Sequence, residues 1–171
     1  MPEGRRVHGL VSAQEKAIAL FEEVQARGLV APGRGEREVS DLIRDLANEM
    51  CGTTKHWHER IVRPGPNTLL PYRETPPDRI VAAADIAAAD IAFADFGPIF
   101  EEYEADFGRT YVFGDDPHEH RLLADLPRIF DAGRAHFAAR AGRTCHWIIE
   151  LHRVDRERGF GGFYEQLLDL A

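Results

Sequence analysis

The 171-residue chain has no uninterrupted apolar run of about 18 residues, the length that a membrane-spanning helix requires. No apolar segment follows the two arginines near the N-terminus, so we expect no secretory signal peptide. There are only two cysteines, Cys51 and Cys145, and neither belongs to a CxxC pattern. These shortages predict a cytoplasmic protein whose cysteines are free thiols.

Basic residues are also in the minority, with 21 lysines and arginines against 29 aspartates and glutamates. The formal charge of −8 makes the chain a poor general ligand for nucleic acids or anionic membranes, and we expect neither as a partner. Apolar residues make up 44% of the chain, which is ordinary for a folded domain and argues against disorder. The length suits one domain with a small extension.

Apolar residues at helical spacing predict two helices in the first third of the chain. Ser12 is a candidate N-cap, with Glu15 completing a capping box, and Gly28 stands where that helix would end. A second amphipathic helix is predicted over about 36–50, with Gly52 as its stop.

The middle of the chain favours extended structure. Five of the ten prolines lie within 64–77, so we expect residues 53–79 to form strand and turns and no helix. A strand is predicted to end near Gly97, and residues 103–114 are predicted to pair with it. The alanine-rich segment 82–89 is ambiguous, because alanine favours helix and is depleted in strands.

The last third of the chain is predicted to be helical. Asp116 followed by Pro117 is typical of a helix start. Pro127 lies inside this third helix and is expected to kink or split it. A fourth helix is predicted over about 144–158. Helices combined with an antiparallel strand pair indicate an α+β fold.

Two aspartates are predicted to meet on one face of the strand pair. If the strands turn at Glu101–Glu102, Asp95 stands opposite Gly108, and Asp106 is its diagonal neighbour on the same face. Two such carboxylates repel each other unless a proton or a cation joins them. Hard oxygen ligands of this type suit Mn, Mg, Co or Zn ions. The alternative is a pair of solvated acids with Arg109 as their ion-pair partner.

At these residues the sequence resembles a known family. The triplet Asp95-Phe96-Gly97 is followed, eleven residues after its aspartate, by Asp106-Phe107-Gly108-Arg109-Thr110. This pattern is similar to the first half of the pita-bread metallopeptidases (family M24), which include Xaa-Pro aminopeptidases, prolidases, methionine aminopeptidases and creatinase. The resemblance covers roughly residues 13–162. It implies a partial pita-bread domain there, with an N-terminal extension at 1–12 and a divergent C-terminal tail at 163–171.

The resemblance also implies the roles of the two aspartates. Asp95 would be a bidentate ligand of one metal ion and Asp106 would bridge two, with Mn, Co or Zn as the cofactor and a peptide as the substrate. In the family, a histidine and two glutamates from the second half of the domain complete the site. Because 65 residues follow Asp106, we expect the chain to be truncated before its second strand region, with three of the five ligands missing.

The chain departs from the family at a second place as well. Pro71 occupies the position of the histidine that contacts the substrate in typical relatives. His56 or His58 could supply that role from nearby, and we keep His58 as a catalytic candidate. The spacing of these two histidines also puts both on one side of an extended segment, where they could bind metal. His118 and His120, at a helix start, are expected to be solvated.

Three hypotheses therefore stand. The first is a metal-dependent, aminopeptidase-like protein of the kind that hydrolyses Xaa-Pro bonds, inactive as an isolated chain because its dinuclear site is incomplete. The second is a non-catalytic relative that binds a peptide or a protein, and the third is an unrelated α+β domain with incidental aspartates. Since half of such a fold leaves a strand edge unpaired and an apolar face uncovered, we also expect a homo-oligomer or another protein partner.

Overall fold

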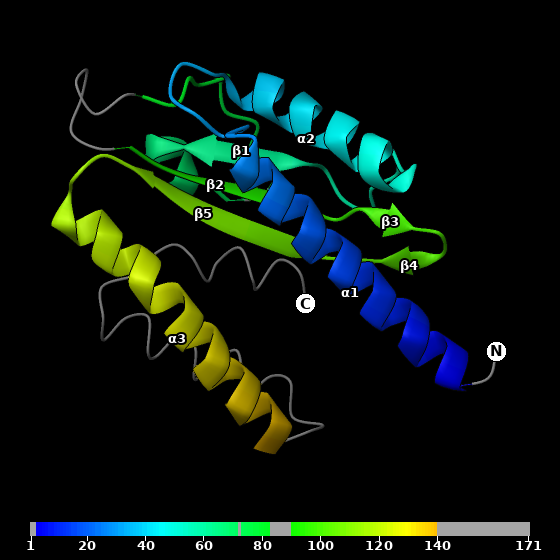
Figure 1. The fold of residues 1–171 in the computed structure, drawn as a ribbon. Coiled ribbons are helices and arrows are strands. Elements are labelled where there is room, and N and C mark those ends of the chain that lie inside the picture. The colour runs from blue at the N-terminus through cyan, green and yellow to red at the C-terminus, as the bar shows by residue number, and fades with distance from the viewer. Residues whose placement is uncertain (1–2, 72, 83–89, 140–171) are drawn as a thin grey trace. The chain divides into compact units, whose positions relative to one another are not determined.

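A computed structural model describes residues 3–71, 73–82 and 90–139 (Figure 1). The chain divides into two compact units. The first unit comprises residues up to 68 together with 77–114, and the second comprises 69–76 together with the residues from 115 onward. The two aspartates of the predicted site both belong to the first unit.

The first unit is a small antiparallel sheet with two helices on one of its faces (Figure 1). The helices are α1 (Glu3–Ala26) and α2 (Glu36–Cys51). The sheet has the strand order β1 (Ile61–Pro64), β2 (Asp90–Phe96), β5 (Phe107–Phe113). A 3-10 helix, η1 (Gly65–Leu69), follows β1, and a short hairpin of β3 (Ile99–Phe100) and β4 (Tyr103–Glu104) joins β2 to β5.

Alternation along β2 separates the core from the opposite face of the sheet. Ala92, Ala94 and Phe96 are fully buried and face the helices, where they join apolar residues of α1 and α2 in one cluster. Phe21 of α1 packs against Phe96 at 6.0 Å and against Phe107 of β5 at 5.1 Å between ring centroids. The helices therefore cover the even-numbered residues of β2, and the odd-numbered residues lie on the other face.

The first helix begins earlier than the sequence predicted, at Glu3, so the prediction of Ser12 as its N-cap is wrong. Ser12 lies inside α1, because the apolar residues Val7, Leu10 and Val11 continue the helical spacing upstream of it. Gly9 has a packing role in this helix. A Cβ at Gly9 would overlap the ring of Tyr103, so its absence lets the β3–β4 hairpin lie directly on α1.

The prediction of the second helix is confirmed. Helix α2 ends at Cys51, and Gly52 follows in the left-handed conformation at φ 66°. The Gly52 N–H donates to the carbonyl of Asn48 at 2.8 Å, which satisfies one of the last free carbonyls of the helix. Val39, Ile43 and Leu46 are buried, as the helical spacing predicted.

The predicted strand pair is confirmed together with its register. Asp95 of β2 stands opposite Gly108 of β5, and the chain turns at Glu101–Glu102 between β3 and β4. Glu101 takes a positive φ of 60° in this turn. The proline-rich segment contains strand β1, as expected, but the expectation of no helix there is wrong, because the segment also forms the 3-10 helix η1. Residues 83–89 of the ambiguous alanine-rich segment lie outside the described residues.

In the second unit, α3 (Pro117–Ala139) begins where the sequence predicted. The Asp116 carboxylate accepts a hydrogen bond from the backbone N–H of His118 at 2.7 Å, as an N-cap does. Pro127 lies inside this helix and does not split it, since the helix is continuous to Ala139. The predicted fourth helix, with Cys145, lies outside the described residues.

Two further findings concern the described residues. Cys51, at the end of α2, is a free thiol, as predicted. No helix among the described residues combines the length and the apolar character needed to cross a bilayer.

Candidate metal centre

The two aspartates predicted to meet do so, at one end of the β2–β5 pair. Asp95 is the next-to-last residue of β2, and Asp106 directly precedes β5. A third side chain, His58, joins them. Each of the three offers one ligand atom, and these atoms all lie within 4.8 Å of one another. We call these three residues the His58 cluster.

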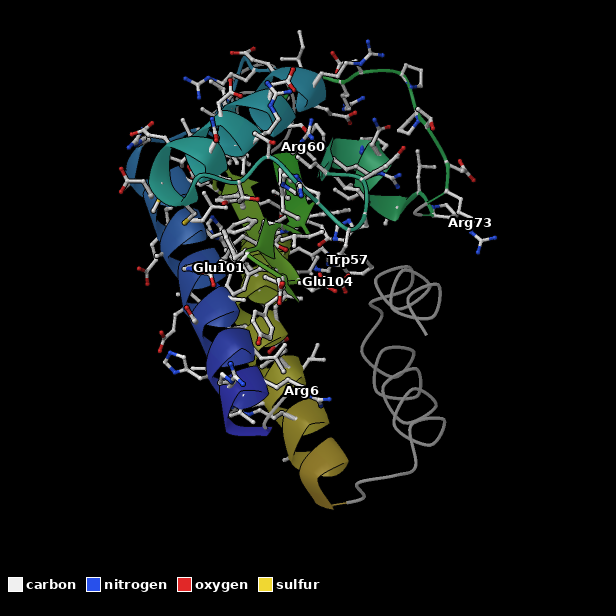
Figure 2. The ribbon with its side chains drawn as sticks, turned by 90° about the vertical axis from the view of Figure 1, so that its right-hand side faces the viewer. Arg6, Trp57, Arg60, Arg73, Glu101 and Glu104 are labelled. Carbon is white, nitrogen blue, oxygen red and sulfur yellow. The ribbon has the colours of Figure 1, made fainter. Side chains whose placement is uncertain are left out.

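The chain segment before β1 carries His58 to this place. The backbone N–H of Trp57 donates to the carbonyl of Gly97 at 2.9 Å, and that of Ile99 donates to the carbonyl of Lys55 at 2.9 Å. The Trp57 indole N–H donates to the carbonyl of Ala105 at 2.8 Å. In Figure 2, Trp57 is seen near Glu104, the last residue of β4. These hydrogen bonds thus hold residues 55–57 against both ends of the connection between β2 and β5.

Gly97 makes room for this arrangement. A Cβ at Gly97 would overlap the His58 ring and the Trp57 indole, with the His58 Nε2 at 2.6 Å. The glycine of the Asp95-Phe96-Gly97 triplet therefore allows a histidine from another part of the chain to approach the aspartates. The His58 side chain is 5% exposed, whereas those of Asp95 and Asp106 are 28% and 51% exposed.

Burial disfavours the charged form of both aspartates. Burial and, to a smaller extent, the negative charge of Asp106 together raise the pKa of Asp95 to about 6, against the opposing effect of the positive form of His58. Burial also raises the pKa of Asp106, again against the opposing effect of His58. Two carboxylates held this close, one of them largely buried, are stabilised by a proton or by a cation. The same arrangement suits a divalent metal ion.

The alternative role of Arg109 as ion-pair partner of the aspartates is wrong. Arg109 stands opposite Ala94, which faces the helices, and its guanidinium lies 5.0 Å from the centroid of the Phe107 ring. Strand alternation therefore puts Arg109 on the other face of the sheet from Asp95.

The other predicted site residues do not join the cluster. The His56 ring packs against Phe96 at 5.9 Å, and its Nδ1 lies 3.3 Å from the carbonyl of Thr54. The segment bends after His56, so the two histidines do not share one ligand site as a regular strand would have allowed. Pro71 belongs to the second unit. His118 and His120 are exposed, as predicted.

The sequence predicted that the two aspartates converge but not that His58 lies with them. From the sequence, His58 was a candidate for substrate contact, and His56 and His58 together were a candidate pair for metal binding. The informative signal was Gly97, since a glycine after a strand often marks a close approach by another part of the chain. Local patterns do not show that the approaching residue is His58, because hydrogen bonds to residues 40 or more positions away hold it there.

Comparison with known proteins supplies an independent observation. The model of metallopeptidase family M24 matches residues 9–168. An Xaa-Pro dipeptidase of Pyrococcus furiosus is 26% identical over 154 residues, which cover 89% of this chain and 40% of that protein. The chain thus spans less than half the length of this curated relative.

Two solved structures resemble the chain. An X-Pro aminopeptidase from Thermotoga maritima matches with a TM-score of 0.69 and 20% identity, over 93% of this chain and 43% of that one. A recombinant prolidase from Thermococcus sibiricus matches with a TM-score of 0.55 and 24% identity, over 74% and 33%. These likenesses confirm the predicted α+β fold as the corresponding part of the pita-bread architecture.

The raised pKa of Asp95 predicts how stability depends on pH in the metal-free chain. The folded chain binds this proton more tightly than the unfolded chain does, so the free energy of unfolding falls as pH rises from about 4 through about 6. We expect Asp95→Asn to raise that free energy by about 1–3 kcal/mol near pH 7.5, and the gain to shrink near pH 4. Urea unfolding in the presence of a chelator measures both values.

The control for this experiment is Asp45→Asn, which changes an exposed aspartate of α2. Its effect should stay within about 0.5 kcal/mol at both pH values. If Asp95→Asn destabilised the metal-free chain near pH 7.5, the account of the Asp95 environment would be wrong.

Proposed function

Because this chain belongs to metallopeptidase family M24, we propose that Asp95 and Asp106 hold a divalent cation that serves the hydrolysis of Xaa-Pro peptide bonds. The observation that carries this proposal is the convergence of two carboxylates and one imidazole within 4.8 Å, at the end of a strand pair. Mn, Co and Zn ions are the candidates, since each accepts carboxylate oxygens as ligands.

The protein's own groups would act by position and by charge. Asp95 is anchored in β2 and Asp106 at the start of β5, so the backbone pairing of the two strands sets the distance between their carboxylates. When bound, a divalent ion supplies a Lewis acid for a peptide carbonyl and a more acidic water as the nucleophile. Asp106 is half exposed, so this side of the cluster is accessible to a ligand from solvent.

We further propose that this chain on its own has negligible peptidase activity. Among residues 3–71, 73–82 and 90–139, the one group suited to a metal is the His58 cluster. Two carboxylates leave most positions around a pair of metal ions to water, whereas hydrolysis needs tightly positioned metals and a group that handles the proton. By the family resemblance, the remaining ligands would come from the second half of the domain.

Other expectations stay predictions. They include the domain limits at 13–162, a cytoplasmic location, and association with a second copy or another protein. In favour of association, Val7, Leu10 and Val11 of α1 are each about half exposed, and β5 pairs with β2 alone among the described strands. An apolar helix face and an open strand edge are both surfaces that proteins tend to cover.

Metal binding predicts a cation-dependent rise in the melting temperature. A ligand that binds only the folded chain adds about 2.7 kcal/mol of stability at one hundred times its dissociation constant. We expect several degrees of increase with Mn²⁺, Co²⁺ or Zn²⁺, and no increase in Asp95→Asn or Asp106→Asn, by calorimetry against a chelator baseline for each variant. Asp45→Asn should keep the full increase. Equal increases in all four proteins would place the metal elsewhere.

The proposed inactivity is tested with an Xaa-Pro dipeptide. We expect cleavage by the 171-residue chain in Mn²⁺ or Co²⁺ to be no faster than cleavage in buffer with the metal alone, because the described residues gather too few donors for a pair of metal ions. Chromatographic measurement of the released proline checks this. Robust turnover that disappears in Asp106→Ala would show that the chain is an active peptidase.

A further inference from the structure

We propose that His58 is a third protein ligand of the cation held by Asp95 and Asp106, so that this chain carries a one-nitrogen, two-carboxylate site of its own. The inference rests on the proposed function, since it assumes that the two aspartates bind metal. It goes beyond that proposal in assigning a direct metal contact to His58, which the family resemblance suggested only as a substitute for a substrate-contacting residue.

The distances in the cluster suit a shared ion. His58 Nε2 lies 4.0 Å from an Asp95 carboxylate oxygen and 3.9 Å from an Asp106 carboxylate oxygen. These separations exceed the length of a direct hydrogen bond. Two donors that each stand about 2.1 Å from one ion are separated by roughly 3.0–4.2 Å. The His58 nitrogen is therefore spaced from both carboxylates as ligands of one cation are spaced.

The orientation of the His58 ring points the correct nitrogen at the site. Its other nitrogen, Nδ1, lies 2.6 Å from the backbone carbonyl of Glu59. A carbonyl oxygen only accepts hydrogen bonds, so Nδ1 carries the proton in this contact, and in the neutral ring Nε2 keeps its lone pair. Metal-binding histidines commonly donate the second ring N–H to a carbonyl in this way, which fixes both tautomer and direction.

The surrounding contacts hold His58 in place before any ion arrives. The Trp57 ring meets the His58 ring edge-on at 4.4 Å between centroids, and Trp57 is itself bound to Gly97 and Ala105. The absent side chain of Gly97 leaves the space that the His58 ring fills. A side chain that is 5% exposed and packed on several sides loses little further freedom on binding metal.

The chemistry of the donors predicts which ions bind. Two carboxylates alone discriminate only weakly between Zn²⁺ and Mg²⁺, whereas an added imidazole nitrogen strengthens the preference for Zn²⁺ and Co²⁺ over Mg²⁺. A purely structural role for His58 would not produce such a preference. The ratio of zinc affinity to magnesium affinity is therefore a specific measure of nitrogen ligation.

His56 provides the matched control. It lies two residues before His58 and is partly buried, but its ring packs against Phe96, and it is not part of the cluster. Substituting glutamine at either position removes one imidazole from the same segment. Only the His58 substitution removes a donor from the proposed site.

The experiment uses the whole 171-residue chain, freed of metal and titrated calorimetrically with Zn²⁺ and with Mg²⁺. Removing a residue that hydrogen-bonds to a metal ligand typically weakens metal binding about 10–100-fold. Loss of a ligand itself should cost at least as much, so we expect His58→Gln to weaken zinc binding at least about tenfold. Magnesium binding should change little, so the zinc-to-magnesium ratio falls. His56→Gln should leave both affinities within about twofold.

A second measurement needs no substitution and guards against a misfolded variant. In the ¹⁵N-histidine-labelled wild-type chain, addition of Zn²⁺ should shift the Nε2 resonance of His58 strongly and leave the ring nitrogens of His56 nearly unchanged. The His58 resonance is assigned in the same wild-type chain, through bonds from the backbone of residues 57–59 to the ring.

The possible failures are distinguishable. If Zn²⁺ binds and the binding requires Asp95 and Asp106, but His58→Gln keeps full zinc affinity and the His58 resonance does not move, the inference is overturned and the proposed function stands. If Zn²⁺ does not bind to the wild-type chain at all, the proposed function fails and the inference fails with it.

Discussion

The antiparallel pairing of β2 with β5 is the interaction on which the site depends. Asp95 and Asp106 lie on the same face only because Asp95 stands opposite Gly108. A slip of one residue would turn every side chain of one strand to the opposite face and would separate the two carboxylates. The buried residues Ala94 and Phe96 oppose such a slip, because it would move them out of the core and bring Asp95 into it.

Holding the two carboxylates together has an electrostatic cost, and apolar packing on the other face of the sheet offsets it. Two aspartates held together and partly buried resist ionisation, as the raised pKa of Asp95 shows. A core residue, Phe21, packs on both strands and so contributes apolar burial that keeps the carboxylates close in spite of their repulsion. A bound cation removes the repulsion between the two carboxylates. This repulsion in the metal-free chain therefore favours the binding of a cation.

Local sequence patterns predicted the end of α2 and the register of the strand pair, because both depend on residues that are near in sequence. The end of α2 was readable because Gly52 takes a conformation that favours glycine, and the register was readable from the turn at Glu101–Glu102 with strict strand alternation. The start of α1 was misplaced, because Ser12 fits a capping box that the chain does not use.

The position of His58 could not be predicted from sequence, for a different reason. It depends on hydrogen bonds from Trp57 to residues that lie 40 and 48 positions along the chain, and on space left by Gly97. The segment has no regular secondary structure of its own, so no periodic pattern shows which way each side chain points. Functional residues are common in irregular segments of this kind, which hydrogen bonds to distant residues hold in place. Local propensity does not predict how such a segment lies.

The most direct test of the central claim is anomalous X-ray scattering at the zinc absorption edge from crystals of the chain grown with Zn²⁺. The account predicts an anomalous peak within about 2.5 Å of carboxylate oxygens of both Asp95 and Asp106. A zinc-containing crystal with no peak between these two residues would contradict it.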